Sequence, residues 1–265
     1  MALIARSRET PKQGEEMPDR KANDAEARQP QVSVVIPCYN EAENIPLLAD
    51  KVVKAFAGLP EWSYECIFVD DGSTDGTRGQ LNQLQAVDPC MRGLHLTRNM
   101  GQSAALVAGM REAQGEYILT LDGDLQNDPA DFPRFLELLQ EYDCVCGYRA
   151  ARKDTWVRRG SSKIANVVRE WVLHDGIRDS GCGSKGFRKC CVQYIVPFNG
   201  VHRFFAVLIR NAGLSIVECP VAHHPRRHGV SKYGISNRLW RGLFDLVGVL
   251  WLRKRYVHPM IEGKS

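Results

Sequence analysis

The sequence contains no hydrophobic run of the length that a membrane-spanning helix requires. Its most hydrophobic late stretch, Leu246–Leu252, has only seven uncharged apolar residues, whereas a spanning helix needs about 20. The first residues, MALIARSRETPKQGEEMPDRK, include no sustained apolar segment of the kind found in a signal peptide. We therefore expect neither a transmembrane helix nor a signal peptide.

Paired metal-binding and phosphate-binding motifs are also missing. The nine cysteines form no CxxC pair, and the sequences HHP and HRF lack the spacing of zinc ligands. An odd number of cysteines without secretory spacing favours reduced thiols in a cytoplasmic protein. GxxxxGK[ST] does not occur, and no GxGxxG stands between a predicted strand and the helix that follows it, so we expect no Rossmann or P-loop cradle for phosphates.

A strong excess of positive charge is absent as well. With 35 Lys and Arg against 31 Asp and Glu, the net charge of +4 does not indicate a nucleic-acid partner. Its distribution is uneven, because basic residues cluster between Arg149 and Arg159 and between Arg226 and Arg255. Such clusters suit binding of phosphate groups at particular places on the protein.

What is present is an alternation of apolar runs and helical segments. Residues 1–30 are polar and predict a disordered arm. Five strands follow, separated by helices: VSVVIP (32–37), YECIFVDDG (64–72), RGLHLT (92–97), YILTLDGD (117–124) and DCVCGYR (143–149). A later segment, SIVECPV (215–221), also predicts a strand. This order predicts a single α/β domain over 31–232, with a mostly parallel twisted sheet and helices on both faces. Ligands of such sheets bind at the carboxyl ends of the strands.

Acidic residues end the fourth strand. Asp122 and Asp124 flank Gly123, which frees the backbone to direct both carboxylates at one point. Two carboxylates so placed suit Mg²⁺ or Mn²⁺ bridging the phosphates of a substrate, and Gln126 adds a neutral oxygen. The alternative is an ordinary β-turn, in which Asp and Gly are common.

A second acidic group, Asp70 and Asp71, ends the second strand before Gly72 and Ser73. An acid at such a turn reaches the ribose hydroxyls or the base edge of a nucleoside. Alternatively, Asp71 or Ser73 caps the helix that follows.

Five motifs occur in the order seen in family 2 glycosyltransferases: VSVVIPCYNEAENI, VDDGSTDGT, RNMGQSAALVAG, LDGDLQNDP and HGVSKYG. Over residues 32–235 the chain resembles their polyprenyl-phosphate branch, the dolichol-phosphate mannosyltransferase-like enzymes. The resemblance implies a GT-A-like fold that binds a nucleotide sugar through Pro37, Tyr39, Glu41, Asp70 and Asp71. It also implies that Asp122, Asp124 and Gln126 bind Mg²⁺ or Mn²⁺ on the diphosphate.

The same resemblance implies roles on the acceptor side. Arg149, Arg226 and Lys232 would neutralise phosphate charge, and Ser231 would add a hydroxyl. Without cations, a phosphate acceptor and a diphosphate donor would repel each other. The alternative for the basic residues is a solvated surface. Asp179 matches an aspartate near the acceptor, and we assign it to positioning because a phosphate oxygen needs no strong base.

The function implied is metal-dependent transfer of a sugar from a nucleotide sugar to a polyprenyl phosphate, with inversion, at the cytoplasmic face of a membrane. One alternative is transfer to a glycan, lipid or protein hydroxyl, with Asp179 as the base. A nucleotidyltransferase also uses paired carboxylates, but it would release pyrophosphate. A membrane-binding module without activity would leave the acidic strand ends unexplained.

Residues 233–265 predict an amphipathic membrane-associating helix and tail. From Ile235 to Tyr256 we expect the helix to lie in the membrane surface and to make the protein peripheral to the membrane. The residues expected to face lipid are Leu239, Leu243, Leu246, Leu250 and Trp251, and those expected to face headgroups are Arg238, Arg241, Arg253, Lys254 and Arg255. The alternative is that the apolar residues pack on the sheet as ordinary core.

Overall fold

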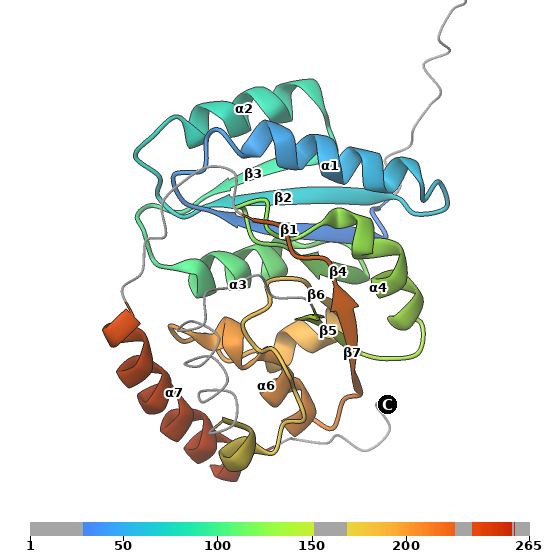
Figure 1. Ribbon diagram of the computed structural model, residues 1–265. Coiled ribbons are helices and arrows are strands. Elements are labelled where there is room, and N and C mark those ends of the chain that lie inside the picture. Colours follow the sequence, from blue (N-terminus) through green and yellow to red (C-terminus); the bar gives the residue numbers. More distant parts are fainter. Residues whose placement is uncertain (1–28, 151–168, 226–234, 256, 258–265) are drawn as a thin grey trace, which may run out of the picture.

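The computed structural model describes residues 29–150, 169–225, 235–255 and 257 (Figure 1). The predicted amino-terminal arm therefore lies outside the described residues, apart from its last two positions. Among the described residues, no helix is both long enough and apolar enough to cross a membrane.

One mixed sheet forms the centre of the molecule, with the strand order β3-β2-β1-β4-β6-β5-β7. All strand pairs are parallel except those that β6 makes with β4 and β5. The predicted mostly parallel sheet is thus confirmed. The strands are β1 (Val32–Cys38), β2 (Tyr64–Asp70), β3 (Met91–His95), β4 (Tyr117–Thr120), β5 (Cys144–Arg149), β6 (Lys185–Arg188) and β7 (Ile216–Val221).

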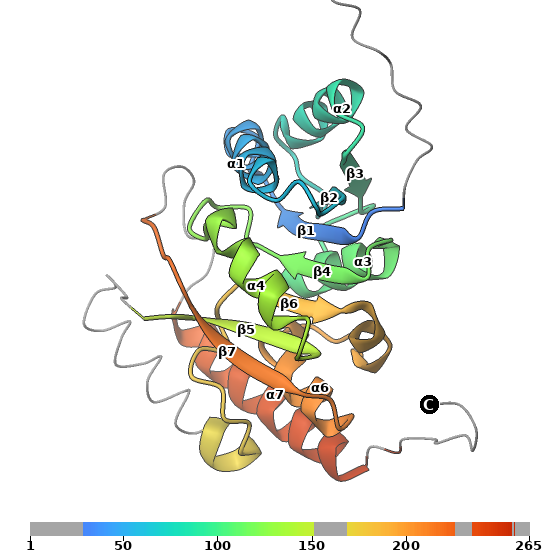
Figure 2. The ribbon, with the colours of Figure 1, turned by 90° about the vertical axis from the view of Figure 1, so that its right-hand side faces the viewer.

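Helices cover both faces of the sheet, as predicted (Figures 1 and 2). On one face lie α1 (Ile45–Ala57), α2 (Thr77–Val87) and α4 (Phe132–Leu138), and on the other α3 (Gln102–Glu112) and α6 (Phe205–Asn211). In α1, Ile45, Leu48, Val52 and Phe56 recur at helical spacing and are buried against the first face. Short 3-10 helices are η1 (Pro129–Asp131), η2 (Lys189–Tyr194) and η3 (Val201–Arg203).

Strand β6 was not predicted from the sequence. Its residues, Lys-Gly-Phe-Arg, have neither an apolar run nor alternation, so periodicity gave no signal. Within the strand, Gly186 fits closely against Phe135 and Leu119, where a Cβ atom would lie 3.1 and 3.3 Å from their side chains. As β6 is antiparallel, the residues that precede it lie at the carboxyl edge of the parallel strands.

Helix α7 (Ile235–Arg255) packs on the α6 side of the molecule. Leu246 and Val249 are buried against Leu173, Phe204 and Val207. The prediction that Leu246 and Leu250 face lipid is therefore wrong, because both contact this cluster. The helix carries two apolar stripes, and periodicity alone did not indicate which one packs inward. The side chains of Leu239 and Leu243 lie outside the described residues.

The opposite stripe of α7 is solvent-exposed. Phe244, Val247 and Trp251 are 81%, 67% and 64% exposed. Trp171, in the helical residues 169–173, is 76% exposed. Arg253 Nη1 of α7 donates a hydrogen bond of 2.5 Å to Leu173 O. We call Phe244, Val247, Trp251 and Trp171 the outer apolar stripe.

The amino edge of the sheet is closed by a buried polar network. The Glu65 carboxylate accepts hydrogen bonds of 2.7 Å from Ser33 Oγ and from Gln114 N, and it forms an ion pair with Arg92. Ser33 Oγ in turn accepts a hydrogen bond of 2.8 Å from Gly115 N. This network joins β1, β2, β3 and the turn before β4 at the end away from the acidic residues.

Candidate active site

The carboxyl ends of β1, β2 and β4 meet at one edge of the sheet. Cys38 is the register partner of Asp70, and Val35 is the partner of Thr120, the last residue of β4. Leu121 N then donates a hydrogen bond of 3.2 Å to Val35 O, which extends the pairing toward Asp122. The structure therefore brings the predicted acidic groups to the same edge.

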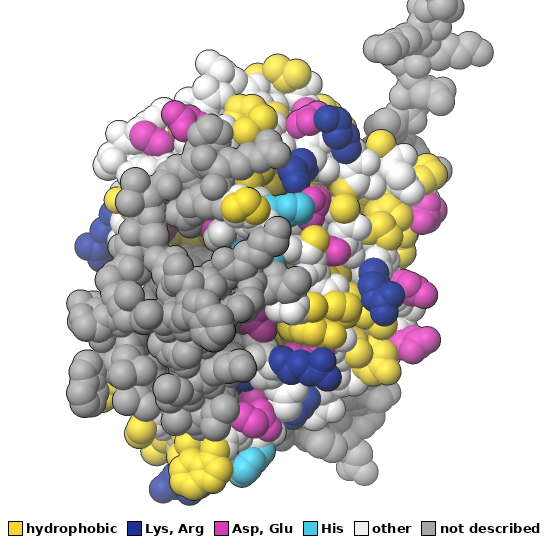
Figure 3. Space-filling model, viewed as in Figure 1, with side chains coloured by type: hydrophobic (Ala, Val, Ile, Leu, Met, Phe, Trp, Pro, Cys, Tyr) yellow, Lys and Arg dark blue, Asp and Glu magenta, His cyan; other side chains and the backbone are white. Residues whose placement is uncertain are grey.

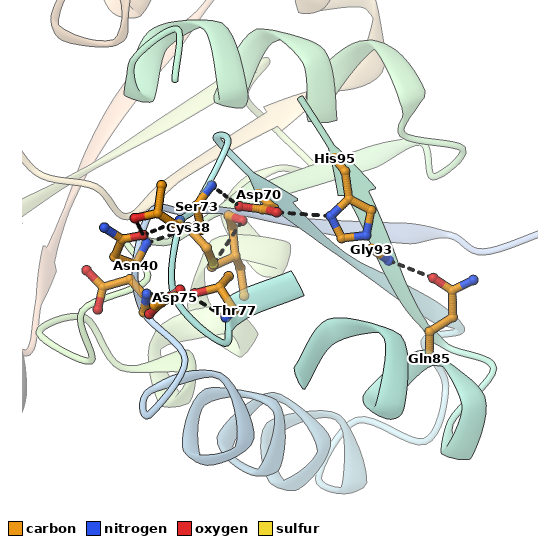
Figure 4. A network of polar contacts seen from close by, with 12 residues as sticks. Cys38, Asn40, Asp70, Ser73, Asp75, Thr77, Gln85, Gly93 and His95 are labelled. Atoms are coloured by element: carbon orange, nitrogen blue, oxygen red, sulfur yellow. Dashed lines mark hydrogen bonds and ion pairs between the residues drawn. The ribbon is translucent and has the colours of Figure 1, made fainter. Parts of the chain in front are cut away.

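The loops after β1 and β2 are bound together by side-chain hydrogen bonds (Figure 4). Asn40, at φ +53°, donates its backbone N–H to Ser73 Oγ at 2.9 Å and accepts from Thr74 N at 2.8 Å. Glu41 N donates to Thr77 Oγ1 at 2.9 Å. Pro37 is buried on β1, and Tyr39 and Glu41 are partly exposed beside this junction, so the three residues implied for the base lie together.

Asp70 is almost fully buried at the end of β2, with 2% exposure. One carboxylate oxygen accepts a hydrogen bond of 2.9 Å from Ser73 N, and the other lies 3.1 Å from His95 Nδ1 on β3 (Figure 4). Burial alone would raise the pKa of Asp70, but the hydrogen bonds from Ser73 and His95 outweigh it and lower the pKa. Asp70 is therefore an ionised carboxylate in a fixed orientation.

Asp71 anchors the loop that leads into α3. Its oxygens accept hydrogen bonds from Met100 N at 2.7 Å and from Gly101 N at 2.8 Å. Burial raises the pKa of Asp71 in spite of these two hydrogen bonds. The close approach requires a glycine at position 72, where φ is +67° and a Cβ atom would lie 2.5 Å from Asn99 N.

The acidic loop after β4 is partly buried. Asp122 Oδ1 accepts a hydrogen bond of 2.7 Å from Gln102 Nε2, and Asp124, 8% exposed, accepts one of 3.1 Å from Gln126 N. Leu125 takes a positive φ of +61°, which turns the chain sharply between these residues. The compact turn that was the alternative interpretation is thus present, and it carries both carboxylates.

This donor set fits a hard divalent cation. Asp122 and Asp124 offer carboxylate oxygens, and Gln126 offers an amide oxygen, which are the ligand types that Mg²⁺ and Mn²⁺ prefer. Across the described ranges no group of three or more His, Cys, Asp and Glu side chains could hold a metal ion by itself. Oxygens of a bound diphosphate would complete the coordination of a cation held here.

Arg149 and Asp179 form a bidentate ion pair beside the acidic loop. Arg149 Nε donates to Asp179 Oδ2 at 2.6 Å, and Nη2 donates to Oδ1 at 2.9 Å. Burial would lower the pKa of Arg149, but Asp179, with a smaller contribution from Asp122, raises it. The loop that carries Asp179 precedes β6, and its Gly183 lies against the Asp122 carboxylate.

The predicted residues Arg226, Ser231 and Lys232 lie outside the described residues. The end of β7 that leads toward them is bound to the acidic loop. His224 N donates a hydrogen bond of 2.9 Å to Gln126 O, and His224 Nε2 lies 3.0 Å from Asp128 Oδ2.

Three residues of this region were missed by the sequence analysis: Gln102, Gly183 and His95. Gln102 lies within the motif RNMGQSAALVAG, which contributed to the resemblance but received no role. Gly183 lies in a Gly-rich stretch without a recognisable turn motif, and His95 lies on a strand where histidine has no special meaning. Only the packing of distant segments brings these residues to the site.

The sequence of this chain is similar to those of known proteins. A family model described as glycosyl transferase family 2 matches residues 33–193. Dodecaprenyl-phosphate galacturonate synthase of Rhizobium johnstonii is 36% identical over 235 residues, which cover 86% of this chain and 69% of that protein. Undecaprenyl-phosphate 4-deoxy-4-formamido-L-arabinose transferase of Aeromonas hydrophila is 37% identical over 218 residues, with coverages of 82% and 66%. The chain thus spans about two thirds of the length of these relatives.

Solved structures of other proteins have a fold similar to that of this chain. Glucosyl-3-phosphoglycerate synthase from Mycobacterium tuberculosis, crystallised with Mn²⁺, UDP and glucosyl-3-phosphoglycerate, aligns with a TM-score of 0.60 at 18% identity, covering 88% of this chain and 83% of that one. A crystal form of the same enzyme with Mg²⁺ and UDP gives a TM-score of 0.61 at 17% identity, with coverages of 88% and 82%. These similarities extend to the fold alone, whereas the sequence matches reach further: the chain belongs to glycosyl transferase family 2 and is a glycosyltransferase.

Proposed function

We propose that the protein transfers a sugar from a nucleotide diphosphate sugar to a polyprenyl phosphate. The observation that carries the proposal is the contact between the loop before β6 and the acidic loop after β4. It brings Asp122, one of the two carboxylates that suit a metal ion, close to the loop whose Asp179 binds the cation Arg149. Two phosphate-bearing substrates can meet only where positive charge separates them. The two relatives described above are named for dodecaprenyl phosphate and undecaprenyl phosphate.

The donor would bind along the ends of β1 and β2. Pro37, Tyr39 and Glu41 would surround the base, and Asp70, held in place by Ser73 and His95, would support the nucleoside. Both Asp71 oxygens already accept backbone hydrogen bonds, so its contribution would be to shape the nucleotide site. Asp122, Asp124 and Gln126 would hold Mg²⁺ or Mn²⁺, which when bound neutralises the developing charge of the diphosphate leaving group.

The acceptor would bind beside Arg149. An oxygen of its phosphate forms the bond to the anomeric carbon, the bond from that carbon to the diphosphate breaks, and the nucleoside diphosphate leaves. Direct displacement inverts the configuration. The phosphate is already an anion, so no proton has to be removed. Asp179, whose oxygens both accept from Arg149, would orient the guanidinium and would not act as a base.

The membrane side of the proposal rests on the outer apolar stripe. Hydrophobic and basic side chains lie next to each other at the lower end of the face in Figure 3, where Figure 1 places the carboxyl end of α7. Arg253, Lys254 and Arg255 are exposed there. Aromatic side chains beside cations match the interface of an anionic bilayer, so we propose peripheral attachment through this stripe.

The test is a screen of UDP- and GDP-linked sugars with Mn²⁺ and a polyprenyl phosphate in anionic vesicles. We expect formation of a polyprenyl-phosphate sugar together with release of the nucleoside diphosphate. Release of pyrophosphate would indicate a nucleotidyltransferase. Turnover of a hydroxyl acceptor with no use of the lipid phosphate would refute the proposal and restore Asp179 as a candidate base.

A further inference from the structure

Gln102 and Gly183 contact the same carboxylate from two directions. Gln102 is the first residue of α3, and its Nε2 donates a hydrogen bond of 2.7 Å to Asp122 Oδ1. Gly183 precedes β6, and a Cβ atom built on it would lie 2.5 Å from Asp122 Oδ1 and closer still to Cγ and Oδ2. The Asp122 carboxylate therefore lies against backbone that has no room for a side chain.

Neither neighbour can easily move away. Gly183 O accepts a hydrogen bond of 2.8 Å from Thr120 Oγ1, and Ser184 O accepts one of 3.0 Å from Gly147 N, so the backbone is bonded on both sides. Gln102 follows Gly101, whose N–H is bonded to Asp71. Both contacts of Asp122 thus belong to segments that are themselves fixed by strands β2, β4 and β5.

We infer that Gln102 and Gly183 are positioning residues for Asp122. The amide of Gln102 fixes the rotamer of the carboxylate without neutralising its charge, and Gly183 provides the space in which that rotamer lies. This inference rests on the proposed function, in which Asp122 is a ligand of the divalent cation. Groups that orient a metal ligand are worth about 10- to 100-fold in metal affinity when they are removed.

The variants Gln102→Met and Gln102→Ala separate a donor from a packing group. Methionine is similar in length to glutamine and uncharged, but it has no N–H to donate to Asp122 Oδ1. If the donated hydrogen bond matters, Mn²⁺ affinity falls in both variants. If only packing matters, Gln102→Met stays close to the wild type and Gln102→Ala is the weaker variant.

The variants Gly183→Ala and Gly181→Ala form a matched pair in one loop. An added methyl at 183 overlaps the flexible Asp122 side chain, so the protein still folds but the carboxylate must rotate. At 181 the nearest atoms to an added Cβ are 3.6 Å away at Arg149 Nη2 and 3.8 Å away at Asp179 Oδ1, which is ordinary contact. We expect Mn²⁺ affinity to fall roughly tenfold or more in Gly183→Ala and to remain unchanged in Gly181→Ala.

The measurement is Mn²⁺ binding by electron paramagnetic resonance, in the presence of UDP and separately of GDP, together with thermal unfolding of each variant. Equal Mn²⁺ affinity in the wild type, Gln102→Met and Gly183→Ala overturns the inference, as does an equal loss in Gly181→Ala. A wild-type protein that binds Mn²⁺ but forms no glycolipid refutes only the proposed function. A wild-type protein that binds no Mn²⁺ with either nucleotide overturns both.

Discussion

At the scale of single residues, the site consists of carboxylates in different environments. Asp70 receives hydrogen bonds that lower its pKa, Asp71 has its pKa raised by burial, and both Asp179 oxygens are bonded to Arg149. The Asp124 carboxylate accepts a hydrogen bond from the backbone N–H of Gln126, two residues away in the same turn. These different surroundings suit the different roles that we propose for the carboxylates, and each proposed role can be tested by one substitution.

Replacing Asp124 with Asn keeps the size of the side chain and removes the charge that attracts a cation. We expect turnover to fall about a hundredfold or more, because the lost interaction stabilises charge in the transition state. Asp50→Asn is the control, since Asp50 forms only an exposed ion pair with Lys54 on α1. The measurement is the steady-state rate at saturating Mn²⁺. Near-normal turnover of Asp124→Asn would show that Asp124 is not a metal ligand.

Asp179→Asn tests whether this residue is a base. Asparagine retains one acceptor oxygen for Arg149, so a positioning role predicts a loss of only about tenfold, whereas loss of a general base costs up to about 10⁴-fold. We also expect the pH-rate profile to keep its shape. Disappearance of an acidic limb from the profile, together with the larger loss, would favour a hydroxyl acceptor.

The sequence was sufficient to place the acids of the site but not their neighbours. Asp70, Asp122 and Asp124 directly follow or end apolar strands, and parallel topology alone brings such positions together. Gln102 and Asp122 are 20 residues apart, and their contact depends on how α3 packs beside β4. Periodicity contains no information about that packing.

At the scale of elements, α7 carries two apolar stripes in different environments. Its inner stripe, with Leu246 and Val249, belongs to the core cluster, and Asp245 forms an ion pair of 3.5 Å with Arg203 of η3. The existence of this amphipathic helix was predicted correctly, but the face that packs inward was not. Deleting the whole helix would expose buried side chains, so point variants on the outer apolar stripe are the better probe.

The double variant Phe244→Ser, Trp251→Ser should weaken binding to anionic vesicles at least about tenfold, because each ring would otherwise leave water on docking. We expect unchanged thermal stability, since both side chains are exposed. Val87→Ser is the control, as Val87 is 84% exposed on α2, far from α7. Vesicle sedimentation measures the effect, and equal binding by all three proteins would contradict membrane attachment through this stripe.

At the scale of the whole molecule, the amino edge and the carboxyl edge of the sheet carry different groups of polar residues. The amino edge is closed by the Glu65 network, which binds three strands together through buried hydrogen bonds. The carboxyl edge carries the acidic loops and the Arg149–Asp179 pair. Stability and activity should therefore respond to different substitutions.

Glu65→Ala removes the acceptor shared by Ser33, Gln114 and Arg92. We expect the free energy of unfolding to fall by roughly 2 to 4 kcal/mol, because buried donors lose their partner. The specific activity of the protein that remains folded should be unchanged. Urea denaturation with parallel assays tests both statements, and Glu61→Ala, at an exposed position, is the control. A loss of activity without a loss of stability would contradict this division between the edges.

The antiparallel direction of β6 has a consequence for how such proteins diverge. In sequence, the segment that carries Asp179 runs from the helical residues 169–173 to β6, apart from the loops that follow β1, β2 and β4. Under the proposed function, insertions or exchanges in this segment would alter the choice of acceptor without changing the sequence of the loops that bind the donor. Gly183 sets a limit to such variation, since any side chain there would displace the Asp122 carboxylate, which is a proposed metal ligand.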